Sequence, residues 1–372
     1  MARHSIAFLV ALLLAFSPTA RAKNPAVTDL KKRFEEVCEN RKFMGAVSIT
    51  VNGREIFSGA CGWADVQRKI KNTIDTRFLI GSITKEFTAA AVLLLYQEKR
   101  FELSDPIGKY LPNLPETWQA ATIHQLLTHT SGVPIYTASA DGKGINPELD
   151  HLVLDGDIPN RLLDLVRNRP LLHAHGEKFT YNNSGYILLG MLIEKGSGMA
   201  YSEFVQKRIF DRLQMRDSAY RDPRATVPRL ARGYELEGLE LRNGEVDPRS
   251  AWSAGVLYST VRDLTRWSEA MAQNKLLNSD SASRVYGLYP EAVAKDPYNQ
   301  VGHYGYGIVL TERFRHHLQF HGGGIRGFNS VLQRYPEQKV VLAVLSNLDS
   351  DLMPSWTLAD SLAQIWFRSN GR

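Results

Sequence analysis

The chain has 372 residues, of which 44% are hydrophobic and 23% charged, with 28 Gly, 16 Pro and 2 Cys. This composition is close to the average for soluble globular proteins and excludes collagen, a disulfide-rich scaffold and a disordered chain. The net charge of +6 comes from 45 basic and 39 acidic residues. The basic residues are scattered instead of forming a stripe, so we expect no nucleic-acid partner. A chain longer than about 250 residues usually exceeds one core, which predicts two lobes.

The first 22 residues have the pattern of a secretory signal peptide. Arg3 and His4 precede an apolar run over residues 6–16, and Ala20-Arg21-Ala22 matches the small-x-small pattern that signal peptidase cleaves. The apolar run is too short to span a bilayer. A buried N-terminal helix is disfavoured because the run has no polar face. We expect a mature chain from Lys23, periplasmic or secreted, with no membrane anchor.

Export would place the two cysteines in an oxidising compartment. Cys38 and Cys61 are 23 residues apart. A disulfide and two small buried thiols fit this spacing equally well. The spacing does not match a metal-binding C-x-x-C pattern.

The two ends of the mature chain predict one antiparallel sheet. A helix is expected over residues 27–38, and two β-rich segments then flank Asn52-Gly53, the strongest short hairpin signal. Near the C-terminus, apolar patterns predict four more strands and a closing helix. The predicted strands are residues 45–51, 55–61, 306–311, 318–321, 329–335 and 340–346, and the closing helix is 356–368. We expect the terminal helices to pack against this sheet.

Between these ends the periodicity is mostly helical. Asp105-Pro106 predicts a helix start, Thr122 with Gln125 forms a capping box, and an apolar helix over residues 185–195 is expected to end at Gly196. Residues 235–244 predict a surface loop or hairpin.

The predicted fold class is therefore α/β of the α+β type, with an antiparallel sheet from both termini flanked by helices. The sheet lobe comprises residues 23–98 and 300–372. Residues 99–299 form an inserted, mostly helical lobe, and an active site is expected at the interface.

The strongest chemical signal is Ser82-Ile83-Thr84-Lys85, which precedes a long apolar helical run. Ser82 and Lys85 are three residues apart and share one helix face. An amine within reach of a hydroxyl can activate a serine, which is otherwise a weak nucleophile. The helix N-terminus adds N–H groups where an oxyanion would develop. Because a chain of this length contains about one accidental Ser-x-x-Lys, the motif needs support from elsewhere.

Two further segments give that support. Tyr181-Asn182-Asn183 precedes the predicted apolar helix, and His321-Gly322-Gly323-Gly324 ends a predicted strand. In this order the three segments resemble the Ser-x-x-Lys, Tyr-x-Asn and Lys/His-x-Gly elements of the serine β-lactamase and penicillin-recognising family. The resemblance covers almost the whole mature chain. Further segments similar to family signatures are residues 103–112, 122–132, 181–190 and 253–260.

The resemblance implies catalytic roles for four residues. Ser82 would attack a carbonyl carbon and become acylated, while Lys85 and Tyr181 would share the removal of its proton. Tyr181, as an anion or a proton shuttle, would then protonate the leaving group. His321 would donate to Tyr181 and to a substrate carboxylate, and affinity for anionic substrates would weaken at alkaline pH.

The resemblance also implies substrate-binding residues. Asn183 would bridge Lys85 and the amide of the substrate. The backbone N–H groups of Ser82 and Gly324 would form the oxyanion hole, and Gly323 and Gly324 would let a ligand approach the strand closely. Residues 128–132 are a family hallmark that we expect to buttress the cleft. Specificity is expected from loops over residues 136–160 and 235–247.

We expect neither a metal nor another cofactor. His173-Ala-His175 and His316-His317 lack a third ligand at a diagnostic spacing, so we predict solvated loops.

The predicted function is that of an exported serine hydrolase acting through an acyl-enzyme. No Gly-x-Ser-x-Gly elbow is present, which disfavours an α/β-hydrolase. The motifs are closer to class C β-lactamases, D-Ala-D-Ala carboxypeptidases, D-aminopeptidases and esterases than to class A enzymes. His321 replaces the Lys usual in class C enzymes, which argues against efficient β-lactam turnover. We favour a carboxypeptidase or peptidase acting on D-amino-acid peptides such as cell-wall stems.

Two alternatives stay open. One is a carboxylesterase or weak β-lactamase of the same family. The other, from a different class, is a protein that binds penicillin or wall peptides without turnover.

Overall fold

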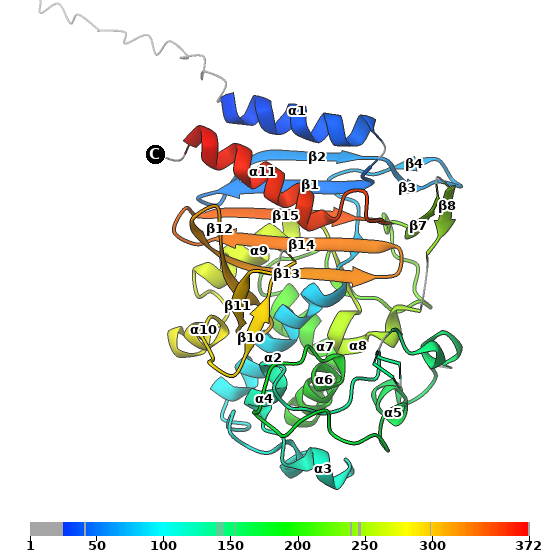
Figure 1. Ribbon diagram of the computed structural model, residues 1–372, viewed down its shortest axis with the longest axis vertical. Helices are drawn as coiled ribbons and strands as arrows, with labels where there is room; N and C mark the ends of the chain where they lie inside the picture. Colours follow the sequence, from blue (N-terminus) through cyan, green and yellow to red (C-terminus); the bar gives the residue numbers. More distant parts are fainter. Residues whose placement is uncertain are drawn as a thin grey trace, which may run out of the picture.

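The fold is organised around an eight-stranded antiparallel sheet built from both ends of the chain (Figure 1). Its strand order is β10-β11-β12-β13-β14-β15-β1-β2, so the N-terminal hairpin joins the C-terminal strands through β1 and β15. The strands are β1 (Gly45–Val51), β2 (Arg54–Cys61), β10 (Val293–Lys295), β11 (Val301–Tyr304), β12 (Val309–Arg313), β13 (His316–Ile325), β14 (Phe328–Tyr335) and β15 (Val340–Ser346). The predicted antiparallel sheet from both termini is confirmed.

The computed structural model describes residues 25–40, 42–139, 141–142, 144–152, 154–238, 240–244, 247–297 and 299–370. The predicted signal peptide, residues 1–22, lies outside the described residues. No helix among the described residues is sufficiently long and apolar to cross a bilayer.

Helices occupy most of the chain between the two contributions to the sheet. The α-helices are α1 (Pro25–Glu39), α2 (Thr84–Gln97), α3 (Glu116–Gln119), α4 (Ile123–Leu127), α5 (Ile158–Asp164), α6 (Asn183–Ser197), α7 (Tyr201–Val205), α8 (Trp252–Gly255), α9 (Val261–Ala272), α10 (Ser279–Val285) and α11 (Ser355–Asn370). Single turns of 3₁₀-helix are η1 (Gly81–Ile83), η2 (Ile107–Lys109), η3 (Pro147–His151) and η5 (Pro248–Ser250), and η4 (Gln206–Phe210) is a π-helical turn.

Short strands form three small sheets beside the main one. They are the pair β3 (Trp63–Asp65) and β4 (Ile70–Lys71), the triplet β5 (Phe78–Leu79), β9 (Leu257–Ser259) and β6 (Ala219–Tyr220), and the triplet β16 (Leu348–Asp349), β7 (Tyr234–Glu237) and β8 (Glu240–Asn243). The segment predicted as a loop or hairpin over residues 235–244 is the hairpin of β7 and β8.

Strand β15 shows why both faces of the sheet are covered. Val340 and Leu342 pack in the core cluster that contains residues of α1 and α11, whereas Val341 and Ala343 pack in the cluster that contains residues of α2 and α9. Side chains alternate between the two faces of a strand, so a continuous apolar run requires cover on both sides. Helices α1 and α11, one from each end of the chain, lie together over one face (Figure 1).

Several predicted ends of elements differ from the structure. Strand β12 starts at Val309, not at 306, because Gly307 takes a left-handed φ of +77° in a tight turn. Helix α6 continues through Gly196 and ends at Ser197, and the C-cap residue Gly198 has a left-handed φ of +71°. At Asp105-Pro106 there is only the turn η2, and it has no side-chain cap. The Asp105 carboxylate instead accepts hydrogen bonds from Glu102 N–H and the Tyr110 hydroxyl. The capping box of Thr122 and Gln125 is confirmed.

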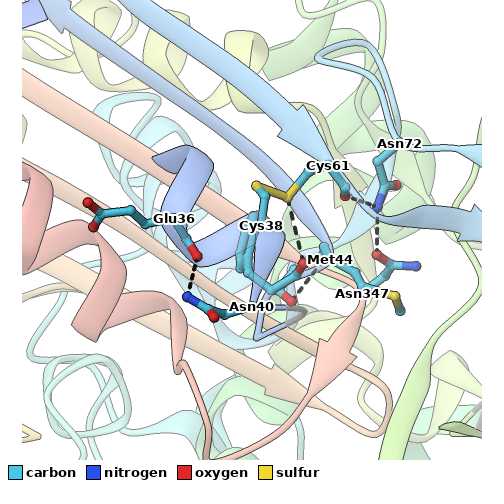
Figure 2. Close-up of a disulfide and its surroundings, with 9 residues drawn as sticks. Glu36, Cys38, Asn40, Met44, Cys61, Asn72 and Asn347 are labelled. Atoms are coloured by element: carbon cyan, nitrogen blue, oxygen red, sulfur yellow. Dashed lines mark hydrogen bonds between the residues drawn. A yellow bond between two sulfur atoms is a disulfide. The ribbon is translucent and has the colours of Figure 1, made fainter. Parts of the chain in front are cut away.

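A disulfide joins the N-terminal helix to the sheet (Figure 2). Cys38 lies near the end of α1 and Cys61 ends β2, with their Cα atoms 6.0 Å apart. The sequence is compatible with either a disulfide or two free buried thiols, and the structure contains the disulfide.

Candidate active site

Ser82 lies in the turn η1, which leads directly into α2. The turn starts at Gly81 with a φ of +49°, and a Cβ on Gly81 would lie 2.8 Å from the backbone nitrogen of Gly324. Any larger residue at position 81 would therefore push η1 away from β13. This close approach of two backbones places Ser82 beside the glycine-rich end of β13.

Lys85 is fully buried, one turn after Ser82. Its Nζ lies 3.0 Å from Ser82 Oγ and donates a hydrogen bond of 2.8 Å to the carbonyl oxygen of Ala254. Burial lowers the pKa of Lys85 well below its ordinary value, because apolar surroundings disfavour the ammonium. The pair thus combines a hydroxyl with an adjacent amine that can accept its proton.

Tyr181 brings a phenol to this pair. It directly precedes Asn182, the N-cap residue of α6, and its ring centroid lies 4.9 Å from Lys85 Nζ. The residue is 37% exposed overall. Desolvation raises the pKa of Tyr181, and the interaction of its side chain with Ser82 acts in the opposite direction. A raised pKa favours a protonated phenol, which fits a proton shuttle better than a resting anion.

His321 is buried near the same site, but both of its ring nitrogens are occupied. Nε2 lies 2.8 Å from the Tyr304 hydroxyl, and Nδ1 contacts the carbonyl oxygen of Gly322. A carbonyl can only accept, so Nδ1 carries the ring proton and Nε2 accepts from Tyr304. Burial and the nearby charge of Lys85 lower the pKa of His321 to about 3.

The expected role of His321 as a donor therefore does not fit the structure. A neutral imidazole with its single N–H bound to Gly322 has no proton to offer Tyr181 or a substrate carboxylate. The ring centroids of Tyr181 and His321 are 6.3 Å apart, so the two residues are neighbours without the expected hydrogen bond.

Asn183 and Gly323 also differ from expectation. Asn183 Nδ2 donates to Thr137 Oγ1 at 3.1 Å, and so its amide turns toward the loop after α4 instead of bridging to Lys85. A Cβ on Gly323 would lie 2.0 Å from the carbonyl oxygen of Ile80, so this glycine admits the protein's own backbone and not a ligand. At Gly324, by contrast, a Cβ would meet nothing within 4 Å.

Ser82 opens into a cavity of about 200 Å³. Asn183 and Gly324 line it together with Ser82, and Ile145, Leu149 and Ile325 give it an apolar wall. The first predicted specificity loop, residues 136–160, supplies much of the lining.

Two charged residues, Arg326 and Asp150, also line this cavity. Arg326 forms an ion pair of 3.3 Å with Asp150 and lies 3.8 Å from Glu235. The second predicted loop, residues 235–247, contacts the cavity lining through Glu235, which lies near Arg326, and through the Asp247 carbonyl, which accepts from Ser250 Oγ at 2.8 Å. Neither Arg326 nor Asp150 belongs to a motif that the sequence shows.

Three other site residues were missed or given no specific role. The carbonyl of Ala254 binds Lys85, although its segment was noted only as a family signature. Tyr304 binds His321 from β11, where a tyrosine in a strand gives no chemical signal. His129 lies under Tyr181, with 4.4 Å between the ring centroids. The Tyr-Gly-Tyr-Gly segment at 304–307 is the one sequence feature that could have drawn attention to Tyr304.

His173, His175 and His317 each bind other groups of the protein. The described part of the chain contains no group of three or more His, Cys, Asp or Glu arranged to hold a metal ion. His173 is buried and binds the Ala174 carbonyl and Thr180 Oγ1, so a solvated loop is the wrong description for it. His317 is exposed and pairs with Glu337 at 2.8 Å.

A family model and curated relatives match most of the chain. A family model described as Beta-lactamase matches residues 30–364. Penicillin-binding protein 4* of Bacillus subtilis (strain 168) is 28% identical over 340 residues, covering 87% of this chain and 72% of that protein. Protein flp of Staphylococcus aureus (strain MW2) is 30% identical over 322 residues, covering 83% of this chain but only 60% of that protein. The chain thus spans less than two thirds of the second relative.

A solved structure also has the same fold. The D-stereospecific amidohydrolase from Streptomyces sp. superposes with a TM-score of 0.75 at 26% identity, covering 94% of this chain and 98% of that chain. The match extends over nearly all of both chains, so it includes the sheet and the helical segment that together surround Ser82.

Proposed function

The chain belongs to the β-lactamase family and is a serine hydrolase of that family, and from this premise we propose that it is exported and cleaves amide bonds in D-amino-acid peptides. The observation that carries the proposal is the 3.0 Å contact between Ser82 Oγ and the buried Nζ of Lys85. Burial of a lysine costs folding free energy unless its charge is paired or the amine serves a function. Here the neighbours of the amine are a hydroxyl and a carbonyl instead of a carboxylate.

In the proposed reaction, Lys85 accepts the hydroxyl proton as Ser82 Oγ attacks the substrate carbonyl carbon. The backbone N–H groups of Ser82 and Gly324 bind the resulting oxyanion. Tyr181 gives its proton to the leaving amine as the C–N bond breaks, and Lys85 returns a proton to the phenol. Water then hydrolyses the Ser82 ester by the same transfers in reverse. His321 is neutral throughout and holds Tyr304.

Support for the substrate class comes from the relatives. One solved relative is described as a D-stereospecific amidohydrolase and one curated relative as a penicillin-binding protein. A D-Ala-D-Ala carboxypeptidase or a related peptidase fits both. For export, the support is the signal-peptide pattern of residues 1–22 together with the disulfide of Cys38 and Cys61, because disulfides persist mainly in oxidising compartments.

A carboxylesterase is the second candidate, and the apolar wall of the cavity favours it. Ile145, Leu149 and Ile325 can accommodate an acyl chain that carries no D-amino acid. Weak β-lactam hydrolysis belongs to the same mechanism. A binding protein without turnover is disfavoured, because binding alone does not need an amine against the serine hydroxyl.

Labelling and turnover test the proposal. A fluorescent penicillin or fluorophosphonate should label the wild type but not Ser82→Ala, and equal labelling of both would refute it. A D-Ala-D-Ala peptide, short-chain p-nitrophenyl esters and a cephalosporin should then be compared by kcat/KM. A dominant ester rate would favour the esterase, and no more than one equivalent of product per chain with every substrate would favour the binding protein.

A further inference from the structure

His129 binds the backbone of the residues on both sides of Tyr181. The N–H of Thr180 donates to the carbonyl oxygen of His129 at 2.8 Å, and the N–H of Asn182 donates to His129 Nδ1 at 3.1 Å. The imidazole also packs against the Tyr181 ring, with 4.4 Å between centroids. One residue from the segment after α4 thus contacts Tyr181 and both of its neighbours along the chain.

His129 carries two features that a position chosen for stability alone would avoid. Its φ is +60°, a left-handed conformation that is unfavourable for most side chains. Because Nδ1 accepts from Asn182, the proton of the neutral ring lies on Nε2, and this buried nitrogen has no hydrogen-bond partner among the described residues. Strain and unpaired buried polar atoms are concentrated at functional sites.

The neutral form of this ring is compatible with its surroundings. Burial lowers the pKa of His129 well below its ordinary value, and the nearby Lys85 acts in the same direction. The rings of Tyr186 and Tyr304 lie 5.0 and 4.5 Å from it, centroid to centroid, so aromatic groups surround the imidazole. A neutral acceptor can therefore stay in place without adding positive charge next to Lys85.

We propose that His129 is a positioning residue, which fixes the phenol of Tyr181 for proton delivery to the leaving amine. The inference rests on the proposed function, because it assigns His129 an effect only through Tyr181. Tyr181 is partly exposed, so the contacts from His129 restrict its ring on the protein side. A displacement of about 1 Å at a reacting group can reduce the rate by about 100-fold.

The test compares an amide with an ester. His129→Phe keeps an aromatic ring and removes the Nδ1 acceptor. We expect kcat for a D-Ala-D-Ala peptide to fall about 10- to 100-fold with little change in KM. The rate of the acylation burst with p-nitrophenyl acetate should fall less than about 3-fold, since p-nitrophenolate leaves without protonation. Equal losses on both substrates would overturn the proposal, because partial unfolding lowers both rates alike.

Two matched variants sharpen the comparison. His129→Asn supplies a side-chain oxygen as acceptor and tolerates a left-handed backbone, so it should recover part of the amide rate. Lys178→Ala changes an exposed residue three positions before Tyr181, and it should leave both rates unchanged. An amide rate for His129→Asn at or below that of His129→Phe would contradict the role of the acceptor.

A double-mutant cycle separates this proposal from the proposed function. In a Tyr181→Phe background, His129→Phe should cause no further loss, whereas an additional 10-fold loss would show that His129 does not act through Tyr181. Full peptide turnover by Ser82→Ala would instead refute the proposed function. Independently of any activity, a crystal structure of His129→Phe should show the Tyr181 hydroxyl displaced from Ser82, and an unmoved hydroxyl would overturn the positioning role.

Discussion

Ser330 Oγ donates a hydrogen bond of 2.9 Å to the carbonyl oxygen of Ile80, and this bond joins strand β14 to the residue two positions before Ser82. The missing side chain of Gly323 leaves room for the same carbonyl. A Cβ at Gly323 would lie 2.0 Å from that oxygen and 2.5 Å from Ser330 Oγ. The position of Ser82 against β13 therefore depends on a backbone contact that only glycine permits.

The two neighbouring glycines should respond differently to the same substitution. Gly323→Ala must separate η1 from β13, and overpacking of this kind costs about 1–3 kcal/mol. We expect a lower Tm and slower labelling of Ser82. Gly324→Ala adds its methyl group beside the open cavity. We therefore expect an unchanged Tm and a decrease only in the rate of peptide turnover. Thermal unfolding and labelling rates measured on both variants check this, and equal Tm values would contradict it.

Lys85→Met should separate catalysis from stability. Methionine fills a similar volume and removes the amine, so the proton of Ser82 loses its acceptor. We expect labelling of Ser82 to slow by about 1,000-fold or more, equivalent to about 4 kcal/mol of transition-state stabilisation. Because the variant no longer buries an amine, its Tm should equal or exceed that of the wild type. Stopped-flow labelling and calorimetry measure the two effects, and a labelling rate within 10-fold of the wild type would exclude Lys85 as the base.

Local sequence signals predicted the parts of the fold that depend on neighbouring residues. The hairpin at Asn52-Gly53, the capping box at Thr122 and the turn from Ser82 into α2 each need only a few adjacent residues, and each was found as predicted. The strands of the main sheet were predicted from their apolar runs. Such runs are continuous because strands covered on both faces carry apolar side chains on both sides.

The chemistry of single side chains could not be predicted in the same way. Gly323 and Gly324 are identical in sequence, and only packing shows that one admits Ile80 and the other faces the cavity. The state of His321 depends on Tyr304, which lies 17 residues away and becomes its partner only through the strand arrangement. Side-chain partners set by tertiary packing leave no periodic signal in the chain.

The neutral state of His321 predicts a flat pH response for anionic substrates. Its pKa of about 3 means that the imidazole stays uncharged between pH 5.5 and 8.5. The ratio of kcat/KM for a peptide with a free C-terminal carboxylate to that for its C-terminal amide should therefore stay constant over this range. A 10-fold fall in this ratio, centred near pH 6.5, would instead show that a protonated His321 binds the substrate carboxylate, as expected from the sequence.

Removal of the disulfide should lower stability and leave catalysis unchanged. Cys38 and Cys61 close a loop with a sequence separation of 23, and a loop of this length contributes about 3 kcal/mol by the chain-entropy model. The double variant Cys38→Ser/Cys61→Ser should therefore unfold at lower denaturant concentration with the same kcat/KM at 25 °C. A change in kcat/KM would mean that α1 and β2 influence the position of Ser82.

Glu86 should make the stability of the protein depend on pH. Its Oε2 accepts from Trp267 Nε1 at 2.7 Å, while its buried Oε1 has no partner among the described residues. Burial raises the pKa of Glu86 from 4.5 to about 8. Between these values the folded protein holds a proton that the unfolded chain has released. This contribution to stability is thus complete below pH 4.5 and is lost as the pH rises through 8, with a slope of at most about 1.4 kcal/mol per pH unit.

Glu86→Gln removes this titration. Its amide oxygen can still accept from Trp267 Nε1, so we expect the fold to be kept and the Tm to change less between pH 5 and pH 8 than in the wild type. Glu35→Gln, at an exposed position on α1, should retain the wild-type slope and serves as the matched control. Thermal unfolding at constant ionic strength measures the three slopes. If Glu86→Gln and Glu35→Gln gave the same slope, the ionisation of Glu86 would not be coupled to folding, and its carboxylate would have to be solvated in the native state.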